Sequence, residues 1–449
     1  MKFCLVVSTA YLAVGLLFPA TSLAQQPPTA LPVFPGASGY GTTTPAGSGR
    51  HLNPPQTSLV KVTTLSDSGV GSLRDCVKRA GPRVCVFEVS GRIQLGSELL
   101  IDKPYLTIAG QTAPAPGILI TGAGIRVAAN DVLIQHLQVR VGDAPSGPAP
   151  DKRDGITIAG KSATFARNVV LDHLSVSWAI DENVGIWYPT TSDVTISNSI
   201  ISEALYKSIH PKGAHSMGVL VGDGIKRVSM HHNVLAHNYD RNPRMKPGIQ
   251  FEFISNVVYN WGGSSSWNQA NFSDTENLKL ATHVAFIGNY YKRGPSSPAG
   301  ASVYAKPPAA GSKIYVLSNL GPTRTNETLS EWKISSVSES QYRSLSPSFA
   351  LSGITPSSAV DSYQEVLATA GARPRESNSV DRRVISEVTL GTGTIRDCVA
   401  NCPKSAGGYP TMSNIQRAFP VLANPNGDSD GDGYTNLEEQ LHVMAAEVE

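Results

Sequence analysis

Short apolar runs rich in β-branched residues recur along most of the chain and are separated by Gly, Asn, Ser or Asp. Each run has the length of a β-strand, and almost no helical periodicity lies between the runs. The pattern therefore predicts many short strands joined by tight turns. The predicted strands cover residues 105–109, 117–121, 131–135, 168–172, 193–197, 227–231, 251–255, 283–287 and 313–317.

Several of these runs end in an asparagine, at intervals of roughly 20 to 35 residues, which is the length of one solenoid coil with loop insertions. Asparagine tolerates the left-handed conformation of sharp bends, and stacked inward-facing asparagines can hydrogen-bond from coil to coil. A β-sandwich or propeller is the alternative, but paired hairpins and Asn-Gly or Asp-Gly turns are scarce. We therefore predict an all-β solenoid, a parallel β-helix. The asparagines are Asn198, Asn233, Asn256, Asn289 and Asn319.

Beyond about residue 320 the pattern changes, and one helix is predicted over residues 358–371. Serine near its start, apolar residues at helical spacing and Gly371 at its end are typical helix signals. We expect this helix to pack against or cover the solenoid.

The composition fits a folded chain that is not a general nucleic-acid binder. Of 449 residues, 41% are hydrophobic and 16% are charged, which excludes global disorder. The 37 basic and 35 acidic residues give a net charge of +2, without the basic excess that nucleic-acid binding needs. The length favours two to three domains, but a repeat fold can form one long domain.

The first 24 residues resemble a secretion signal. Lys2 precedes an apolar run over residues 4–17, and Ala24 is a small residue suited to cleavage. A membrane anchor is the alternative, but the run is short for a span. We therefore expect a secreted protein, extracellular or periplasmic, with residues 25–32 as a disordered lead-in and no membrane contact after cleavage.

The four cysteines that remain after cleavage form two close pairs. In an oxidising compartment, Cys76 with Cys85 and Cys398 with Cys402 predict two local disulfides. A zinc site is the alternative, but the spacings lack the Cys-x2-Cys pattern.

The tail contains a candidate calcium loop of EF-hand type. Oxygen-bearing side chains occupy positions 1, 3, 5, 9 and 12 of the loop, with Gly433 at position 6 and a backbone carbonyl at position 7. A solvated acidic turn is the alternative. We expect a calcium ion here to fasten the C-terminal segment. The candidate ligands are Asp428, Asp430, Asp432, Tyr434, Asn436 and Glu439.

A second group of charged residues lies in the middle of the chain, where carboxylates are followed by lysines and arginines. In a solenoid these residues can align on one face, which would place a hard cation beside a basic patch and suit an acidic substrate. Histidines between 173 and 237 allow a zinc site as the alternative. Their spacings fit no standard ligand pair, so we expect most of them to be packed or stacking residues.

Residues 33–400 resemble the pectate lyase family of secreted polysaccharide lyases. The resemblance rests on several short motifs, which are 34–41 (FPGASGYG), 69–74 (GVGSLR), 107–114 (TIAGQTAP), 171–178 (LDHLSVSW), 241–244 (RNPR) and 256–261 (NVVYNW). It implies a right-handed single-stranded parallel β-helix with a few short covering helices. The tail over residues 401–449 resembles one appended to some bacterial members.

The resemblance also implies calcium ligands. Asp154, in an Arg-Asp-Gly-Ile motif, resembles the family's first calcium-binding aspartate. Asp181 and Glu182 lie where further acidic ligands are expected, and strand register favours Glu182 while Asp181 stays open. Family members often carry another aspartate four residues on, where this chain has Ile186.

The basic residues take their roles from the same resemblance. Arg241, in Arg-Asn-Pro-Arg, matches the catalytic arginine. Lys212 resembles a lysine that binds the substrate carboxylate. Arg244 and Lys246 lie in the segment that supplies a second basic substrate contact, and the spacing favours Lys246.

These residues together imply calcium-dependent β-eliminative cleavage of (1→4)-α-D-galacturonan, with Arg241 as the base and 4,5-unsaturated oligogalacturonates as products. Pectin lyase activity on methyl-esterified substrate, a non-catalytic polysaccharide-binding β-helix and a β-helix hydrolase are the alternatives. We expect a monomer whose partner is the acidic polysaccharide polygalacturonate or pectin. Asn271 and Asn326 are glycosylation acceptors in a eukaryotic host only.

Overall fold

A computed structural model describes residues 31–160, 164–263, 265–268, 280–300 and 309–449. The expected signal segment, most of the expected lead-in and Asn271 lie outside these residues. None of the helices in the described part of the chain has the length and apolar character needed to cross a membrane.

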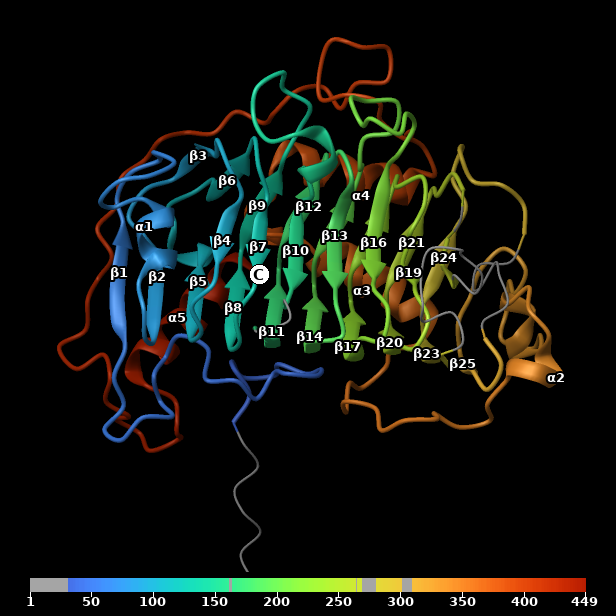
Figure 1. The fold of residues 1–449 in the computed structure, drawn as a ribbon, viewed down its shortest axis with the longest axis horizontal. Coiled ribbons are helices and arrows are strands. Elements are labelled where there is room, and N and C mark those ends of the chain that lie inside the picture. The colour runs from blue at the N-terminus through green and yellow to red at the C-terminus, as the bar shows by residue number, and fades with distance from the viewer. Residues whose placement is uncertain (1–30, 161–163, 264, 269–279, 301–308) are drawn as a thin grey trace, which may run out of the picture.

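The described chain winds into a right-handed parallel β-helix with three parallel sheets of ten, eight and seven strands (Figure 1). In the middle of the fold, neighbours in a sheet are every third strand of the sequence, so each coil contributes one strand to each sheet. This arrangement confirms the predicted fold class.

The ten-stranded sheet contains β1 (Ser58–Val62), β2 (Arg83–Phe87), β5 (Leu106–Ala109), β8 (Val132–Gln135), β11 (Ala166–Asp172), β14 (Thr191–Ser197), β17 (Lys226–His231), β20 (Gln250–Ile254), β23 (His283–Ile287) and β25 (Lys313–Leu317). The eight-stranded sheet contains β3 (Gly91–Gln94), β6 (Ile118–Thr121), β9 (Leu137–Arg140), β12 (Ser175–Ser177), β15 (Ile200–Ser202), β18 (Val234–Ala236), β21 (Val257–Tyr259) and β24 (Tyr290–Lys292). The seven-stranded sheet contains β4 (Leu99–Ile101), β7 (Ile125–Val127), β10 (Ile156–Ala159), β13 (Glu182–Trp187), β16 (Met217–Val221), β19 (Arg244–Met245) and β22 (Trp267–Asn268).

All predicted strand segments coincide with observed strands, and all but segment 117–121 belong to the ten-stranded sheet. Strands of this sheet such as β2, β5 and β8 are buried along their whole length, which explains their continuous apolar character. Most strands of the other two sheets are too short for a periodic pattern to be read from the sequence.

An asparagine ladder runs along one edge of the ten-stranded sheet. The amide of Asn233 donates to Asn256 at 2.9 Å, that of Asn256 donates to Asn289 at 3.1 Å, and that of Asn289 donates to Asn319 at 2.8 Å. All four side chains are fully buried. The prediction of inward-stacked asparagines is therefore confirmed for these four.

Asn198 lies outside the ladder, so the prediction of stacking was wrong there, whereas the predicted left-handed bend is present. Asn198 occupies the preceding position of its coil, in left-handed conformation with φ 50°, and its amide donates to Asp172 at 2.9 Å. Ser199 takes the ladder position instead, because its backbone N–H donates to the Asn233 side chain at 3.0 Å. The left-handed bend likewise falls one residue before Asn233, at His232 with φ 54°.

Helices cover the outside of the solenoid. The predicted helix is observed as α3, where the Ser358 side chain accepts the backbone N–H of Asp361 at 3.1 Å and the helix ends before Gly371. The helices are α1 (Leu73–Lys78), α2 (Glu339–Tyr342), α3 (Ala359–Thr369), α4 (Ser379–Leu390) and α5 (Asn436–Val448), with 3₁₀ turns η1 (Gly110–Thr112), η2 (Pro150–Lys152), η3 (Glu331–Ile334) and η4 (Pro374–Glu376).

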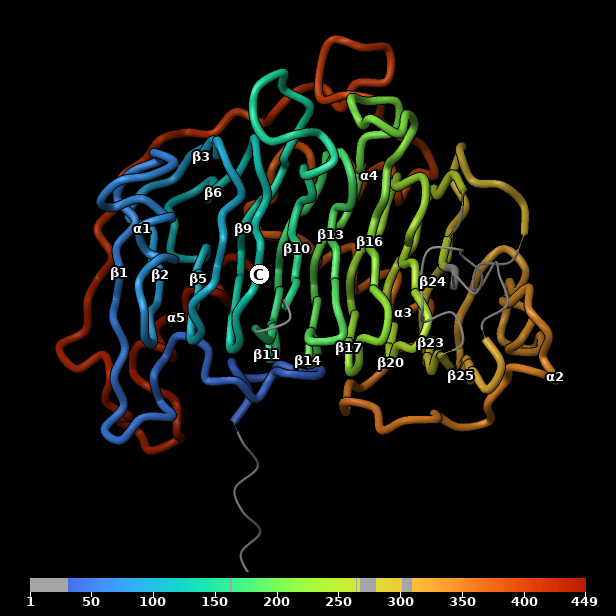
Figure 2. The backbone as a smooth tube through the Cα atoms, viewed as in Figure 1, coloured from blue at the N-terminus to red at the C-terminus, as the bar shows by residue number. Residues whose placement is uncertain are grey.

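The C-terminal segment runs back along the outside of the solenoid toward its first coils (Figure 2). There Leu437 and Leu441 of α5 pack against Val84, Val86 and Ala109 of β2 and β5. Both predicted disulfides, Cys76–Cys85 and Cys398–Cys402, are present.

Candidate active site

The acidic candidates lie close together at the start of two neighbouring strands of the seven-stranded sheet. Asp154 precedes β10, and Asp181 and Glu182 lie at the start of β13. The backbone N–H of Glu182 donates to Asp154 Oδ1 at 3.2 Å, and that of Gly155 donates to the Glu182 carbonyl at 2.9 Å. Parallel pairing of β10 with β13 therefore brings together carboxylates that are far apart in the sequence.

The three carboxylates form a compact oxygen cluster, because ligand atoms of Asp154, Asp181 and Glu182 lie within 4.8 Å of one another. Burial first, and then the charge of Asp181, raise the pKa of Asp154 to about 7. Carboxylates this close repel one another, and a cation relieves the repulsion. An all-oxygen donor set fits a hard ion such as Ca²⁺.

His215 contacts Asp181 directly, and His210 stacks on His215. The Nε2 atom of His215 lies 2.6 Å from Asp181 Oδ1, and the Nε2 atom of His210 lies 3.8 Å from Oδ2. The two imidazole rings stack with centroids 3.9 Å apart and an interplanar angle of 3°. Burial alone would raise the pKa of Asp181, but the His215 hydrogen bond and charge outweigh it, so the pKa is lowered. Sequence reasoning treated these histidines as packing residues and did not find this contact.

Arg241 lies on a later coil of the solenoid and reaches back to the carboxylate cluster. Its Nη1 atom forms an ion pair with Oε1 of Glu182, and both side chains are largely buried. Its Nε atom is buried without a hydrogen-bond partner. Burial first, and then the nearby charge of Arg244, lower the pKa of Arg241 to about 10. The structure therefore brings the predicted base to the predicted acidic group.

Ile186, the departure from the family pattern, faces the interior. It is fully buried in the main apolar core, in register with Ile158 and Val221 of the neighbouring coils. A ligand at this position would have to lie inside the solenoid, so the acidic cluster is confined to the outer side of β13.

The remaining basic candidates lie at different places around the cluster. Lys212 is exposed on the loop between β15 and β16, and its backbone N–H donates to His210 Nδ1 at 3.1 Å. Arg244 is half-buried in β19. Lys246 Nζ forms an ion pair with Asp223 at 2.6 Å and lies 5.7 Å from the ring centre of Trp187. Asp223 was not predicted, because no motif marks it.

A groove opens beside the cluster and offers both charged and aromatic contacts. Tyr188 is 49% exposed, so its ring is available to a ligand. Arg126 and Tyr188 escaped sequence reasoning because they belong to no recognisable motif. The residues that line the groove include Glu98, Arg126, Asp154, Asp181, Trp187 and Tyr188.

The tail folds as a calcium loop would require. Ligand atoms of Asp428, Asp430 and Asp432 lie within 4.8 Å of one another, and α5 begins at Asn436, the ninth loop position. Desolvation and the charges of Asp430 and Asp432 raise the pKa of Glu439, which shows that the twelfth position faces the same aspartates. The Asn436 side chain accepts the N–H of Ser429 at 3.0 Å. Tyr434 is buried, and its backbone carbonyl remains a predicted ligand.

The similar known proteins carry the same name. "Probable pectate lyase C" from Aspergillus terreus is 32% identical over 420 residues, which cover 92% of this chain and 87% of that protein. The protein of the same name from Emericella nidulans is 38% identical over 271 residues, which cover 60% of this chain and 55% of that protein. No family model matches the chain.

Solved structures share the fold at low sequence identity. The cedar pollen allergen Jun a 1 aligns with a TM-score of 0.55 at 15% identity, over 75% of this chain and 92% of that one. A pectate lyase bound to a hexasaccharide aligns with a TM-score of 0.51 at 13% identity, over 75% and 96%. Identity to the Aspergillus terreus protein over nearly the whole chain decides the assignment: this chain belongs to the pectate lyase family of parallel β-helix polysaccharide lyases.

Proposed function

We propose that this protein cleaves polygalacturonate by calcium-dependent β-elimination, with Arg241 as the base. The observation that carries the proposal is the contact between Arg241 and an oxygen cluster formed by Asp154, Asp181 and Glu182. The cluster would hold the cation, and the arginine contacts Glu182, which lines an open groove together with Asp154 and Asp181.

Asp154, Asp181 and Glu182 would be the calcium ligands, and His215 would hold Asp181 in a ligating orientation. Bound calcium would neutralise the uronate carboxylate and so acidify the proton at C5. The fit rests on the donor chemistry, because all three side chains offer oxygen and their repulsion favours a cation.

Arg241 would take the C5 proton, after which the electron pair forms the C4–C5 double bond and the C4–oxygen bond breaks. The leaving oxygen takes a proton from solvent, so the chain is cut without addition of water. Free guanidinium groups are protonated at neutral pH, with a pKa above about 12. Burial and the charge of Arg244 lower the pKa of Arg241, which favours the neutral form that a base requires.

The neighbouring basic residues would bind uronate carboxylates along the groove. Arg244 lies in β19 and Lys246 directly follows that strand, whereas Lys212 lies on the exposed loop between β15 and β16. Lys246 is held by Asp223, so its ammonium is positioned beside Trp187. Tyr188 would stack on a sugar ring.

Pectin lyase activity is the second candidate among lyases, since the fold would serve it equally. A methyl-esterified substrate carries little charge, and it gives no use to three clustered carboxylates beside several cationic groups. A purely binding role would give no reason for a partly desolvated arginine with a lowered pKa.

We also propose that the protein is secreted and that the tail loop binds calcium to fasten α5. Two disulfides fit an oxidising compartment. The acidic loop directly precedes a helix that covers the first coils.

The activity is tested with polygalacturonate and with highly methylated pectin, each with calcium and with excess chelator. We expect unsaturated products from polygalacturonate only, and only with calcium. Chelator-resistant cleavage of methylated pectin would show a pectin lyase, and saturated products with new reducing ends would show a hydrolase.

A further inference from the structure

Two histidines are stacked on the flank of the solenoid, at the ends of two strands of the ten-stranded sheet. His136 follows β8 and His173 follows β11, at equivalent bends because Gln135 pairs with Asp172. Both bends are left-handed, with φ 56° and 47°. The rings lie 5.2 Å apart at an interplanar angle of 15°, and both are buried.

Glu449, the residue after α5, brings a carboxylate to this pair. Its Oε1 atom lies 3.4 Å from Nε2 of His136 and 3.5 Å from Nδ1 of His173. Candidate ligand atoms of all three residues lie within 4.8 Å of one another.

The tautomer of His136 leaves a lone pair directed at Glu449. The Nδ1 atom lies 2.9 Å from the carbonyl oxygen of Ala372, which can only accept, so Nδ1 carries the proton. Nε2 is fully buried and has no hydrogen-bond partner. In its neutral form the ring therefore points a lone pair at a carboxylate oxygen, an unfavourable contact that a cation between the two atoms would relieve.

His173 is placed differently, because its Nδ1 atom faces two carboxylate oxygens, Asp172 Oδ2 at 3.0 Å and Glu449 Oε1 at 3.5 Å. Its ring also makes a backbone hydrogen bond with Thr369. Asp172 is fully buried, and Gln135 and Ser197 donate to it at 3.0 and 2.7 Å. Backbone carbonyls and carboxylates are the usual outer partners of imidazoles that bind a metal, because they fix the orientation of the ring.

We propose that His136 Nε2, His173 Nδ1 and the Glu449 carboxylate form a site for a zinc-like divalent cation. Tetrahedral zinc with bonds of about 2.0–2.2 Å places its ligand atoms roughly 3.3–3.6 Å apart. The 3.4 and 3.5 Å separations at Glu449 match that spacing. Water would supply the fourth ligand, because Asp172 is not among the residues whose ligand atoms lie within 4.8 Å of one another here.

The charges support a divalent ion over a single proton. Asp172 and Glu449 bring two negative charges to a largely buried place, and two neutral imidazoles bring none. A divalent cation neutralises both carboxylates, whereas one proton on His173 neutralises only one. The proton is nevertheless the competing explanation, because Asp172 raises the pKa of His173 against the effect of burial.

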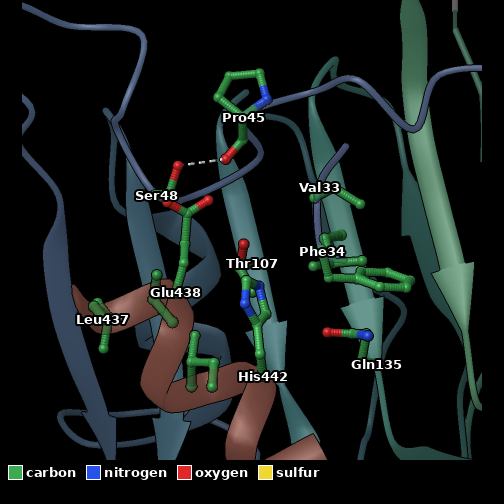
Figure 3. Close-up of a pocket in the computed structure, with 12 residues that line it drawn as sticks. Val33, Phe34, Pro45, Ser48, Thr107, Gln135, Leu437, Glu438 and His442 are labelled. Atoms are coloured by element: carbon green, nitrogen blue, oxygen red, sulfur yellow. Dashed lines mark hydrogen bonds between the residues drawn. The ribbon is translucent and has the colours of Figure 1, made fainter. Parts of the chain in front are cut away.

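The site would fasten the far end of α5. Near the beginning of this helix, Glu438 forms an ion pair with Arg50, and the helix follows directly on the candidate calcium loop. Figure 3 shows Glu438 and His442 at a pocket that Thr107 and Gln135 of the ten-stranded sheet also line. A zinc ion at Glu449 would thus complete the attachment of α5 to the solenoid, independently of the proposed lyase activity.

The test is titration of the full-length, metal-stripped protein with Zn²⁺ in saturating Ca²⁺, which occupies oxygen-rich sites. We expect one zinc ion per chain by calorimetry, and intense visible absorption bands of tetrahedral Co²⁺ when cobalt replaces zinc. Glu449→Gln should weaken zinc binding by about 10- to 100-fold. Glu447→Gln is the matched control on the exposed side of the same helix and should bind zinc like the unchanged protein.

A second variant, His173→Gln, should also lose the tetrahedral Co²⁺ bands, with folding monitored by circular dichroism. The proposal is overturned if no stoichiometric zinc binds, because a proton then explains the cluster. It is overturned equally if Glu449→Gln keeps full zinc affinity, because the ion then binds elsewhere.

Discussion

Arg241 and Glu182 form an ion pair although 59 residues separate them in the sequence. Their proximity follows from the coil register, because Glu182 pairs with Met217 and Met217 bridges to Asp240. The predicted base thus contacts the carboxylate of a predicted calcium ligand. A cation at Glu182 would compete with Arg241, so we expect calcium to loosen the ion pair as it assembles the site.

The first prediction concerns Glu182→Gln, which keeps the shape of the side chain but removes its charge. The calcium concentration for half-maximal activity should rise by about tenfold or more, because a ligand is weakened. The measurement is initial rate against calcium concentration. Asp102→Asn, an exposed carboxylate elsewhere, is the control and should leave the curve in place. An unchanged calcium requirement in Glu182→Gln would exclude Glu182 as a ligand.

The second prediction concerns His215→Gln. His215 touches Asp181 and would act only by positioning it. We expect a calcium requirement raised by about tenfold, with kcat largely recovered at saturating calcium. The exposed His51→Gln is the control. Loss of kcat that calcium cannot restore would instead point to a direct role of His215 in the reaction.

The third prediction concerns Ile186→Asp, which restores the residue often found in the family. Position 186 is fully buried in the apolar core, so the new carboxylate would be unpaired. We expect destabilisation by several kcal/mol and no gain in calcium affinity. Unfolding by urea and the calcium dependence of activity measure the two effects. Tighter calcium binding at unchanged stability would contradict the observed strand register.

The fourth prediction concerns acid stability and rests on Glu203. Its carboxylate is fully buried and pairs with Arg383 and Arg396 at 2.6 and 2.9 Å. Burial alone would raise its pKa, but these arginines, together with His237, lower it from 4.5 to about 2. A lowered pKa means that the stabilisation is complete above pH 4.5 and is lost as the pH falls toward about 2.

Glu203→Gln should therefore lower the free energy of unfolding at neutral pH by about 3 kcal/mol and flatten its fall in acid. Urea unfolding between neutral pH and pH 3 gives both quantities. Parallel acid profiles for the variant and the unchanged protein would mean that other carboxylates dominate.

Much of the fold could be predicted because the ten-stranded sheet is buried on both faces. Segment 131–135 contains an apolar run of three residues, and segment 193–197 alternates apolar and polar residues, and both patterns are typical of strands. The short strands β12 and β18 carry no comparable signal, since three residues cannot show a period. The helix α4 was missed although Val380, Val384 and Val388 recur at helical spacing.

The candidate site was predictable only where motifs carry it. Arg241 and Asp154 stand in recognisable tetrapeptides, and the structure brings both to one cluster. His215 contacts Asp181 of that cluster, and Asp223 contacts Lys246. Both lie on loops whose positions depend on how the coils stack. Sequence spacing does not report such contacts between coils.

The most direct test of the lyase mechanism follows ultraviolet absorbance of unsaturated uronates during incubation with polygalacturonate. The full-length protein is compared with Arg241→Ala and with the exposed control Arg79→Ala, each with calcium and then with excess chelator. We predict a rise with calcium that chelator abolishes, that Arg241→Ala loses, and that Arg79→Ala keeps. An undiminished rise in folded Arg241→Ala, or one that chelator does not affect, would contradict the account.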